Sequence, residues 1–290
     1  MVVVDNGSAD GTRDRVAAAF PEVRLVALDR NLGFPAACNR GVAACSGGVV
    51  VLLNNDVEVR PEFLEQLVRP LRQDPRAGSA AALLIDAGEQ TIDSVGLTVD
   101  RTLAGFPRLR GRPLGEAASP RPLLAGPSGG AGAYRRAAWE AVGGLDEGVV
   151  GYGEDVDLAL RLRAAGWIAA AAPGAVGVHL GSSSFGRRSA WQRYHGGFAR
   201  GYFLRRYRVL RGAAGAQMVA TEVLVAAGDA LLARDLAALR GRVAGWRAAA
   251  ACAPLPPPPA DALDGSIGFR ESLRLRRVVY GARPGPDTPR

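Results

Sequence analysis

The chain contains no lysine, two histidines and three cysteines among its 290 residues. Cys38, Cys45 and Cys252 form no CxxC pair and no even set, which argues against a disulfide scaffold or a cysteine-rich zinc site and fits a reducing compartment. No signal peptide is visible, because the apolar start is four residues long and leads directly into Asp5 and Asn6. We therefore expect a cytoplasmic protein.

Long apolar runs are also absent. No stretch reaches the ~20 residues that cross a membrane, and the best candidate, residues 213–233, is interrupted by Gln217, Glu222 and Asp229. A hydrophobic content of 48% with 22% charged residues is that of a globular chain and excludes wholesale disorder. These features indicate a protein that is soluble or at most peripheral to a membrane.

Positive charge is concentrated in one segment. The chain has 36 arginines, 28 acidic residues and a net charge of +8. Residues 187–211 hold eight arginines and no acid, so the remaining 28 arginines balance the 28 acids. A protein that coats nucleic acid with its whole surface is therefore not expected.

Apolar runs alternate with helical patterns and predict an α/β fold: a mixed, mainly parallel sheet with helices on both faces and further C-terminal helices. The expected strands are 2–4, 23–28, 49–53, 80–85, one from 129 and short ones up to 179; the expected helices are 12–20, 61–73, 136–142, 154–165, 187–211, 216–233 and 234–250. Residues 86–125, rich in Gly, Pro and Arg, are expected to be a surface excursion. We expect a catalytic domain over 1–186, a helical arginine- and aromatic-rich region over 187–252, and a proline-rich, loosely ordered tail over 253–290.

Three polar loops follow three successive expected strands: residues 5–8, 31–34 and 54–56. Ligands of open α/β sheets bind at the carboxyl ends of strands, so these loops should converge on one crevice. Asp5 at such an edge can accept hydrogen bonds from a base or ribose, and glycines allow close approach of the backbone. The first loop alone is typical of a simple turn, but three loops in register favour a ligand site.

Two further sets of side chains suggest chemistry. Asp56 is placed to hold a divalent cation, with His179 as a possible supplement, although Asp56 also suits a turn or helix cap. Glu154 and Asp155 open a helix after a glycine-flanked loop. The helix dipole alone explains acids at this position, but a carboxylate there can also accept a proton from a sugar hydroxyl.

Six motifs in a fixed order give the sequence a specific resemblance. They are VDNGSxDGT (4–12), NxGFxxxxNxG (31–41), LNND (53–56), GGLDE (143–147), GEDVDLxxR (153–161) and HLGSSS (179–184). Over about residues 1–210 the chain resembles the family 2 glycosyltransferases, and it is similar to the rhamnosyltransferase-like branch that builds bacterial cell-wall and surface polysaccharides.

The resemblance implies a GT-A fold and inverting transfer from a nucleoside diphosphate sugar, with dTDP-rhamnose as the donor that fits this branch, to a polysaccharide or polyprenyl-linked acceptor. It implies a divalent cation, Mg or Mn, held by Asp56 and supported by His179. Asp155 is the implied catalytic base, and Gly130 and Glu154 the implied acceptor contacts. The implied nucleotide-sugar contacts are Asp5, Gly7, Ser8, Asn31, Gly33, Phe34, Asn39, Asn54, Asn55 and Asp56.

Relative to that family, the chain begins one strand and one helix late. We expect a sheet that lacks an interior or near-central strand and exposes an unpaired edge. We also expect the 290-residue form to be poorly soluble or weakly active until upstream sequence is added. A non-catalytic relic that only binds nucleotide sugars is the alternative function.

The arginines of 187–211 are interleaved with six aromatic residues. Such a mixture suits an anionic membrane surface, where aromatics lie at the interface and arginine reaches phosphate. It equally suits a helix that packs its aromatics on the catalytic domain. Single-stranded nucleic acid is a third reading, which ranks below the membrane because the family modifies lipid-linked or growing glycans. We therefore expect a protein that is peripheral on the inner face of the membrane and does not bind nucleic acid.

Overall fold

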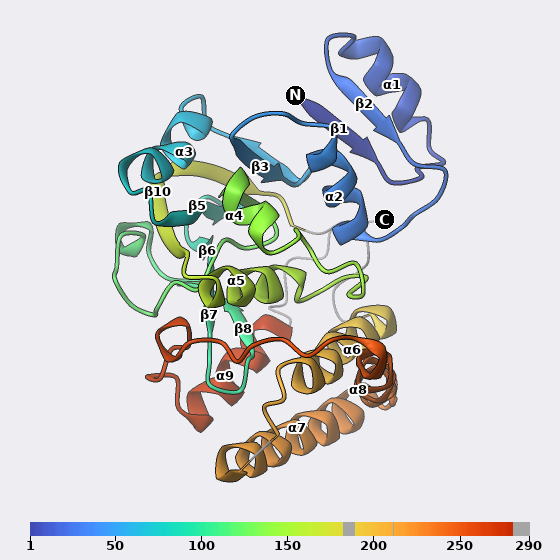
Figure 1. Cartoon of the computed structure of the whole chain (residues 1–290), viewed down its shortest axis with the longest axis vertical. Coiled ribbons are helices and arrows are strands. Elements are labelled where there is room, and N and C mark those ends of the chain that lie inside the picture. Colours follow the sequence, from blue (N-terminus) through green and yellow to red (C-terminus); the bar gives the residue numbers. More distant parts are fainter. Residues whose placement is uncertain (182–188, 211, 281–290) are drawn as a thin grey trace.

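A computed structural model describes residues 1–181, 189–210 and 212–280 (Figure 1). The strands are β1 (Val2–Asp5), β2 (Arg24–Ala27), β3 (Val49–Leu53), β4 (Val57–Val59), β5 (Ala77–Asp86), β6 (Ile92–Val95), β7 (Leu97–Val99), β8 (Gly105–Pro107), β9 (Ala131–Arg135) and β10 (Ile168–His179). The helices are α1 (Thr12–Ala19), α2 (Phe34–Ala43), α3 (Phe63–Gln73), α4 (Arg136–Ala141), α5 (Glu154–Ala164), α6 (Ala190–Arg206), α7 (Gly212–Ala233), α8 (Ala237–Ala248) and α9 (Phe269–Tyr280).

The central sheet has the strand order β3-β9-β5-β10-β4, and β6 pairs with β5. The expected α/β class is confirmed, and the sheet is mixed. Only β1–β2 and β5–β10 pair in parallel within the described ranges, because β9 runs antiparallel to both of its neighbours and β4 and β6 also join antiparallel. The pairing is thus less parallel than the sequence led us to expect.

The parallel pair β1–β2 forms a sheet of its own. Among the described residues, neither β1 nor β3 has a strand on its second side.

Side chains of the central strands alternate between two packed faces. On one face, Phe63 and Leu67 of α3 pack in a cluster with Leu84 of β5. On the other, Trp139 of α4 and Leu158 of α5 belong to a cluster that includes β3 side chains. Helices therefore cover both faces, and the strand ends are left for the loops.

Residues 86–125 are a correction to the sequence analysis, because much of this segment is core rather than surface excursion. β6 extends the central sheet, and β7 and β8 form an antiparallel hairpin. Val95, Val99, Leu103 and Phe106 are at most 2% exposed. Val99 and Leu103 share a cluster with residues of α5 and α6. These strands have only three or four residues each and are surrounded by Gly, Pro and Arg, so the sequence shows no hydrophobic alternation that would identify them.

Helices α6 and α8 pack unusually closely through paired glycines. Gly197 and Gly201 of α6 lie against the carbonyls of Ala238 and Arg242, and Gly241 and Gly245 of α8 lie against those of Tyr194 and Phe198. A Cβ built on Gly201 would lie 1.9 Å from a carbonyl oxygen of α8, and one on Gly241 would lie 2.0 Å from a carbonyl oxygen of α6. Any larger residue would separate the two backbones. Although α7 has 22 residues, no helix in the described ranges is long and apolar enough to cross a membrane.

The tail is a second correction, because residues 260–276 are anchored by buried side chains rather than loosely ordered. Asp264 is 2% exposed and accepts a hydrogen bond from the Leu123 N–H at 2.7 Å. Ser272 of α9 donates to Asp100 at 2.6 Å. These buried polar anchors lie more than a hundred positions from their partners, so local sequence could not reveal them. The end of the expected tail, 281–290, lies outside the described residues.

Candidate active site

The first two polar loops are tied together by Asn6. Its side-chain nitrogen donates to Oδ1 of Asn31 (3.0 Å) and to the carbonyl of Gly33 (3.3 Å), and its Oδ1 accepts from the Leu32 N–H (2.9 Å). Asn31 Oδ1 also accepts from the Gly33 N–H (2.9 Å). The loops that follow β1 and β2 therefore form one hydrogen-bonded unit.

Asp5 ends β1 and is only 4% exposed. Its Oδ2 accepts from Nε of Arg13 (2.6 Å) and from the Ser8 N–H (3.2 Å), and Arg13 also donates to the Leu28 carbonyl. These bonds, that of Arg13 above all, hold the pKa of Asp5 below its ordinary value. Asp5 Oδ1 is buried with no hydrogen-bond partner in the described part of the chain, so one carboxylate oxygen is available to a ligand.

Two glycines allow close approaches in these loops. Gly7 has a φ of 81°, and a Cβ there would lie 2.5 Å from the carbonyl carbon of Arg30. Gly33 has a φ of 88°, and its Cβ would lie 2.8 Å from the Val150 carbonyl oxygen. Glycine is therefore required where the two loops touch and where the segment before α5 closes on them.

Asn39 uses both ends of its amide on the segment that precedes α5. It donates to the Leu145 carbonyl (2.9 Å) and to Oε1 of Glu147 (3.0 Å), and accepts from the Leu145 N–H (3.1 Å). Phe34 is half-buried against the core cluster that contains Leu145. The structure thus gives Asn39 and Phe34 supporting contacts, and their contact with a nucleotide stays a prediction.

The third loop, after β3, lies beside the glycines that precede β9. The Asn54 N–H donates to the Gly130 carbonyl (2.9 Å), and the Gly129 N–H donates to Oδ2 of Asp155 (2.9 Å). Asn55 is exposed. The predicted donor loop, the predicted acceptor contact at Gly130 and the predicted base are therefore neighbours.

His179, at the end of β10, lies between two aspartates. Its Nε2 is 3.4 Å from Oδ2 of Asp56, and its Nδ1 is hydrogen-bonded to Oδ2 of Asp93 at 2.9 Å. Asp93 in turn pairs with Arg110 at 2.8 Å. The hydrogen bond with Asp93 raises the pKa of His179 despite its burial. Burial alone would raise the pKa of Asp93, but His179 and Arg110 hold it below its ordinary value.

Asp56 and His179 fit a divalent cation. Oδ1 of Asp56 is buried with no partner in the described residues, and Oδ2 faces the imidazole Nε2. Asp93 fixes Nδ1 and leaves Nε2 toward Asp56, as second-shell carboxylates do for metal-binding histidines. Residues 1–181, 189–210 and 212–280 hold no cluster of three or more His, Cys, Asp or Glu suited to a metal. Diphosphate oxygens of a bound donor are the further ligands that Mg²⁺ and Mn²⁺ prefer.

Glu154 and Asp155 begin α5, directly after Gly153, whose φ is 93°. Asp155 accepts from the Gly129 N–H through Oδ2 and from the Val156 N–H through Oδ1, at 2.9 and 2.8 Å. Glu154 is 8% exposed, and its Oε2 has no hydrogen-bond partner in the described residues. The pair is thus aimed at Gly129 rather than spread over the first turn of a surface helix.

The two acids titrate differently. Burial, assisted by the charge of Asp155, raises the pKa of Glu154 to about 8. Burial also raises the pKa of Asp155, but its two backbone hydrogen bonds favour the ionised form. Burial thus favours the protonated form of both acids, and the two backbone hydrogen bonds of Asp155 favour its ionised form relative to that of Glu154. An ionised carboxylate beside a neutral acid is suited to take a proton from a hydroxyl group.

Helix α6 packs against α5 and supports the helix that carries the acidic pair. Tyr207, just after α6, donates to Asp157 (2.9 Å), and Tyr202 and Arg206 donate to Asp146 (3.0 and 2.9 Å). Tyr202 and Tyr207 are buried in a core cluster shared with α5. Of the expectations for residues 187–211, packing on the catalytic domain is the one that the described part displays. Residues 187, 188 and 211 lie outside the described residues.

Three residues at this site escaped the sequence analysis. Asn6 stands inside the first motif, where its neighbour Asp5 drew attention. Arg13 is one of many arginines and nothing local marks it. Asp93 lies in the segment expected to be a surface excursion, 86 positions from His179. Only the pairing of β6 with the central sheet brings Asp93 to its partner.

Loops at one edge of a mixed sheet, an aspartate and a histidine that converge, and an acidic pair at a helix start together define a glycosyltransferase of the GT-A fold. Among solved structures, the chain resembles GalNAc-T7 with UDP, GalNAc and Mn²⁺, with a TM-score of 0.53 and 16% identity over 76% of this chain and 44% of that one. A likeness at that identity shows the fold alone.

Sequence comparison names the family. The model of glycosyl transferase family 2 matches residues 1–143. The chain is 32% identical over 213 residues to the N-acetylglucosaminyl-diphospho-decaprenol L-rhamnosyltransferase of Mycobacterium tuberculosis, covering 66% of this chain and 69% of that protein. It is 37% identical over 110 residues to the succinoglycan biosynthesis protein ExoO of Rhizobium meliloti, covering 38% and 31%. The chain belongs to glycosyl transferase family 2.

Proposed function

We propose that the protein is an inverting glycosyltransferase that moves rhamnose from dTDP-rhamnose to a hydroxyl of a polysaccharide or polyprenyl-linked acceptor. The observation that carries the proposal is the buried carboxyl pair at the start of α5, in which Asp155 accepts two backbone hydrogen bonds and both acids lie beside Gly129, next to the Asn54 loop. The choice of donor and acceptor follows the mycobacterial relative, whose name gives a lipid-linked acceptor and rhamnose transfer. Cys38, Cys45 and Cys252 are free thiols, which agrees with the proposed cytoplasmic location.

The nucleotide is held by the unit formed by the loops after β1 and β2. Asp5 Oδ1 is buried without a partner in the described residues and is the acceptor we assign to a base N–H. Gly7, Ser8, Asn31 and Gly33 supply backbone and side-chain groups around it. Asn54, Asn55, Phe34 and Asn39 complete the proposed donor pocket. Because Arg13 already neutralises the other carboxylate oxygen, Asp5 can bind a neutral base without a second cation.

Asp155 acts as the base. Its backbone hydrogen bonds hold the carboxylate in place while it takes the proton of the acceptor hydroxyl. The deprotonated oxygen then attacks the anomeric carbon in line with the departing diphosphate, which inverts the configuration. Glu154, which carries a proton near neutral pH, donates a hydrogen bond that orients the acceptor beside Gly130.

Asp56 and His179 are the residues that would hold a divalent cation. When bound, such an ion neutralises charge that develops on the leaving diphosphate. Asp93 keeps His179 oriented through Nδ1, so the imidazole points toward Asp56 before any ligand arrives. The sequence analysis gave the metal position to Asp56 and His179, and the structure brings those two side chains together.

Substitution of Asp155 by Asn tests the proposal. Transfer of rhamnose from dTDP-rhamnose should fall by about a hundredfold to ten-thousandfold, because the amide cannot accept the proton. Binding of dTDP, measured by calorimetry, should stay close to that of the unsubstituted protein. Asp14→Asn, at an exposed position of α1, is the matched control and should leave both unchanged.

Three outcomes separate the alternatives. If Asp155→Asn retains full transfer, another group is the base and the proposed mechanism is wrong. If the unsubstituted protein binds dTDP but transfers no sugar from any donor in a panel with Mg²⁺ or Mn²⁺, it is a nucleotide-binding relic. If it transfers only from UDP-sugars or GDP-sugars, the chemistry holds and the assignment of rhamnose fails.

A further inference from the structure

Helix α7 exposes apolar side chains and buries one of its two acids, Glu222. Val219, Val223, Leu224 and Leu231 are 45%, 61%, 56% and 79% exposed. By the helical period, Leu224 and Leu231 lie opposite Glu222, and Val223 lies on the flank between them. Leu232, at the helix end, is 87% exposed. Helix α7 lies at the edge of the molecule farthest from β1 and β2 (Figure 1). A soluble helix normally has the reverse arrangement.

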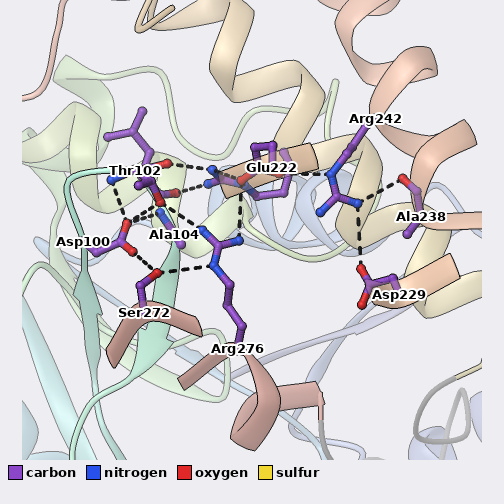
Figure 2. Close-up of polar contacts among 11 residues, drawn as sticks. Asp100, Thr102, Ala104, Glu222, Asp229, Ala238, Arg242, Ser272 and Arg276 are labelled. Carbon is purple, nitrogen blue, oxygen red and sulfur yellow. Dashed lines mark hydrogen bonds and ion pairs between the residues drawn. The ribbon is translucent and has the colours of Figure 1, made fainter. Parts of the chain in front are cut away.

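The orientation of α7 is fixed by a buried ionic cluster. Glu222 is 6% exposed and binds Arg200 of α6 at 2.7 Å, Arg242 of α8 at 3.0 Å and Arg276 of α9 at 3.5 Å. Figure 2 shows Arg242 and Arg276 converging on Glu222 from different helices. Rotation of α7 to hide its leucines would expose this glutamate and leave three buried arginines without it. The apolar side is therefore held outward.

Exposed apolar side chains also occur in the turn after α7 and along α8. Leu236, Leu239, Val243 and Trp246 are between 37% and 48% exposed and recur at spacings of three and four residues, on one side of α8. We call the following eight exposed apolar residues, without Trp246, the α7–α8 face: Val219, Val223, Leu224, Leu231, Leu232, Leu236, Leu239 and Val243. The row on α8 ends at Trp246, whose ring lies 5.3 Å from the Arg205 guanidinium.

That end of α8 borders a pocket of about 400 Å³ lined by Arg205, Arg208 and Trp246 among others. Arg208 is exposed. A guanidinium pair beside an indole ring suits a phosphate group at a lipid–water boundary, where aromatic rings lie and arginine reaches outward. The pocket thus adds an anion-binding element at the edge of the apolar surface.

The exposed charges around the α7–α8 face are arginines, whereas Asp229 and Asp235 are about a third exposed and are ion-paired. Arg234, Arg240 and Arg247 are exposed. The acids of residues 212–248 are three, and each is engaged: Glu222 with the arginine cluster, Asp229 with Arg242 at 3.9 Å, and Asp235 with Arg193. An occupant of this face therefore meets apolar side chains surrounded by positive charge.

We propose that the α7–α8 face docks on an anionic lipid bilayer, with its leucines in the interface and its arginines on lipid phosphate. The combination of an apolar strip with a cationic rim is complementary to such a surface. A second copy of the chain is a poorer occupant, because it would bring the same arginines against one another. The inference adds α7 and α8 to the membrane contact expected of residues 187–211, where Tyr202, Phe203 and Tyr207 are buried but Arg205 and Arg208 line the pocket beside Trp246. It goes beyond the proposed sugar transfer and is tested without donor or acceptor.

Co-sedimentation of the full chain with vesicles is the test. The protein should bind phosphatidylcholine vesicles that contain about 30% phosphatidylglycerol, and binding should weaken as NaCl rises from about 50 to about 500 mM. The double variant Leu231→Ser/Leu232→Ser should bind at least about tenfold more weakly, because two nearly exposed leucines no longer enter the interface. The triple variant Arg234→Gln/Arg240→Gln/Arg247→Gln should lose about fivefold per arginine.

Leu64→Ser, at a 57% exposed leucine of α3, is the matched control and should bind like the unsubstituted protein. Sedimentation velocity without lipid and thermal unfolding accompany each variant, and all should remain folded monomers. The proposal is overturned if the unsubstituted protein ignores anionic vesicles at low salt, or if Leu231→Ser/Leu232→Ser binds them equally well. It is also overturned if the unsubstituted protein is a dimer that this variant dissociates, since a second copy then covers the face.

Discussion

Two buried glutamates in different parts of the molecule behave in opposite ways. Glu154 at the start of α5 is 8% exposed and Glu222 in the middle of α7 is 6% exposed. Burial and the neighbouring Asp155 raise the pKa of Glu154 to about 8. Burial acts on Glu222 in the same direction, but Arg200, Arg242 and Arg276 lower its pKa to about 2. Burial alone therefore does not determine the pKa of a carboxyl group, because neighbouring charges can reverse its effect.

The difference separates a site that can react from one that supports the fold. Glu154 exchanges a proton near neutral pH, which is the range that acid–base chemistry requires. Glu222 stays ionised throughout that range and joins three helices. At the start of α5, no arginine among the described residues offsets the negative charge of the buried Glu154. In the described C-terminal helices, three arginines offset the charge of the buried Glu222. The comparison predicts opposite responses when each carboxylate is neutralised.

Neutralising Glu222 should have a large effect. Glu222→Gln leaves three guanidinium groups, each between 7% and 13% exposed, without their carboxylate. We expect the free energy of unfolding in urea to fall by about 3–5 kcal/mol at neutral pH. The lowered pKa of Glu222 also means that the contribution is present above pH 4.5 and is lost as the pH falls toward about 2.

The control for Glu222 is Glu271→Gln, which breaks an exposed pair with Arg274 at 3.2 Å. Its side chains are 43% and 73% exposed, so the loss should be below about 0.5 kcal/mol. Equal losses in the two variants would show that the buried cluster adds nothing beyond a surface pair.

Glu154→Gln should act in the opposite direction. Because the pKa of Glu154 is raised from 4.5 to about 8, ionisation destabilises the folded chain as the pH rises through this window. The amide cannot ionise, so the variant should be more stable than the unsubstituted protein near pH 8, by on the order of 4 kcal/mol. The two should be equal near pH 4. Urea unfolding across this range measures the difference, and a variant that is less stable near pH 8 would contradict the assignment.

The contrast also explains what the sequence could and could not predict. The loops at the ends of β1, β2 and β3 and the acidic start of α5 were predictable, because apolar runs and their boundaries are local patterns. These features depend on residues within a few positions of one another. The pairing of Asp56 with His179 spans the sequence and followed only from the family resemblance.

The missed features depend on partners far away in the sequence. Glu222 meets Arg200, Arg242 and Arg276 across 22, 20 and 54 positions. The arginine excess of residues 187–211 looked like a free basic surface because its acidic partners lie in other segments. Asp93 was hidden for the same reason, since a strand of four residues brought it to His179. Long-range charge pairing leaves no periodic signal.

Asp5 is an intermediate case in this comparison of buried acids. One arginine pairs with Asp5, whereas none of the described arginines pairs with Glu154 and three pair with Glu222. The bond from Arg13 lowers the pKa of Asp5, but the Arg13 side chain is 37% exposed and solvent weakens the pair.

Arg13→Gln should therefore cost only about 1 kcal/mol or less at neutral pH. A lowered pKa gives stability above 3.8 that disappears as the pH falls through the folded value, so the variant and the unsubstituted protein should converge once the pH lies below the folded pKa of Asp5. Arg15→Gln, whose pair with Asp10 is 3.7 Å long and about 70% exposed on both sides, should show no such dependence. If Arg13→Gln instead cost as much as Glu222→Gln, the number of arginines around a buried acid would not set its contribution.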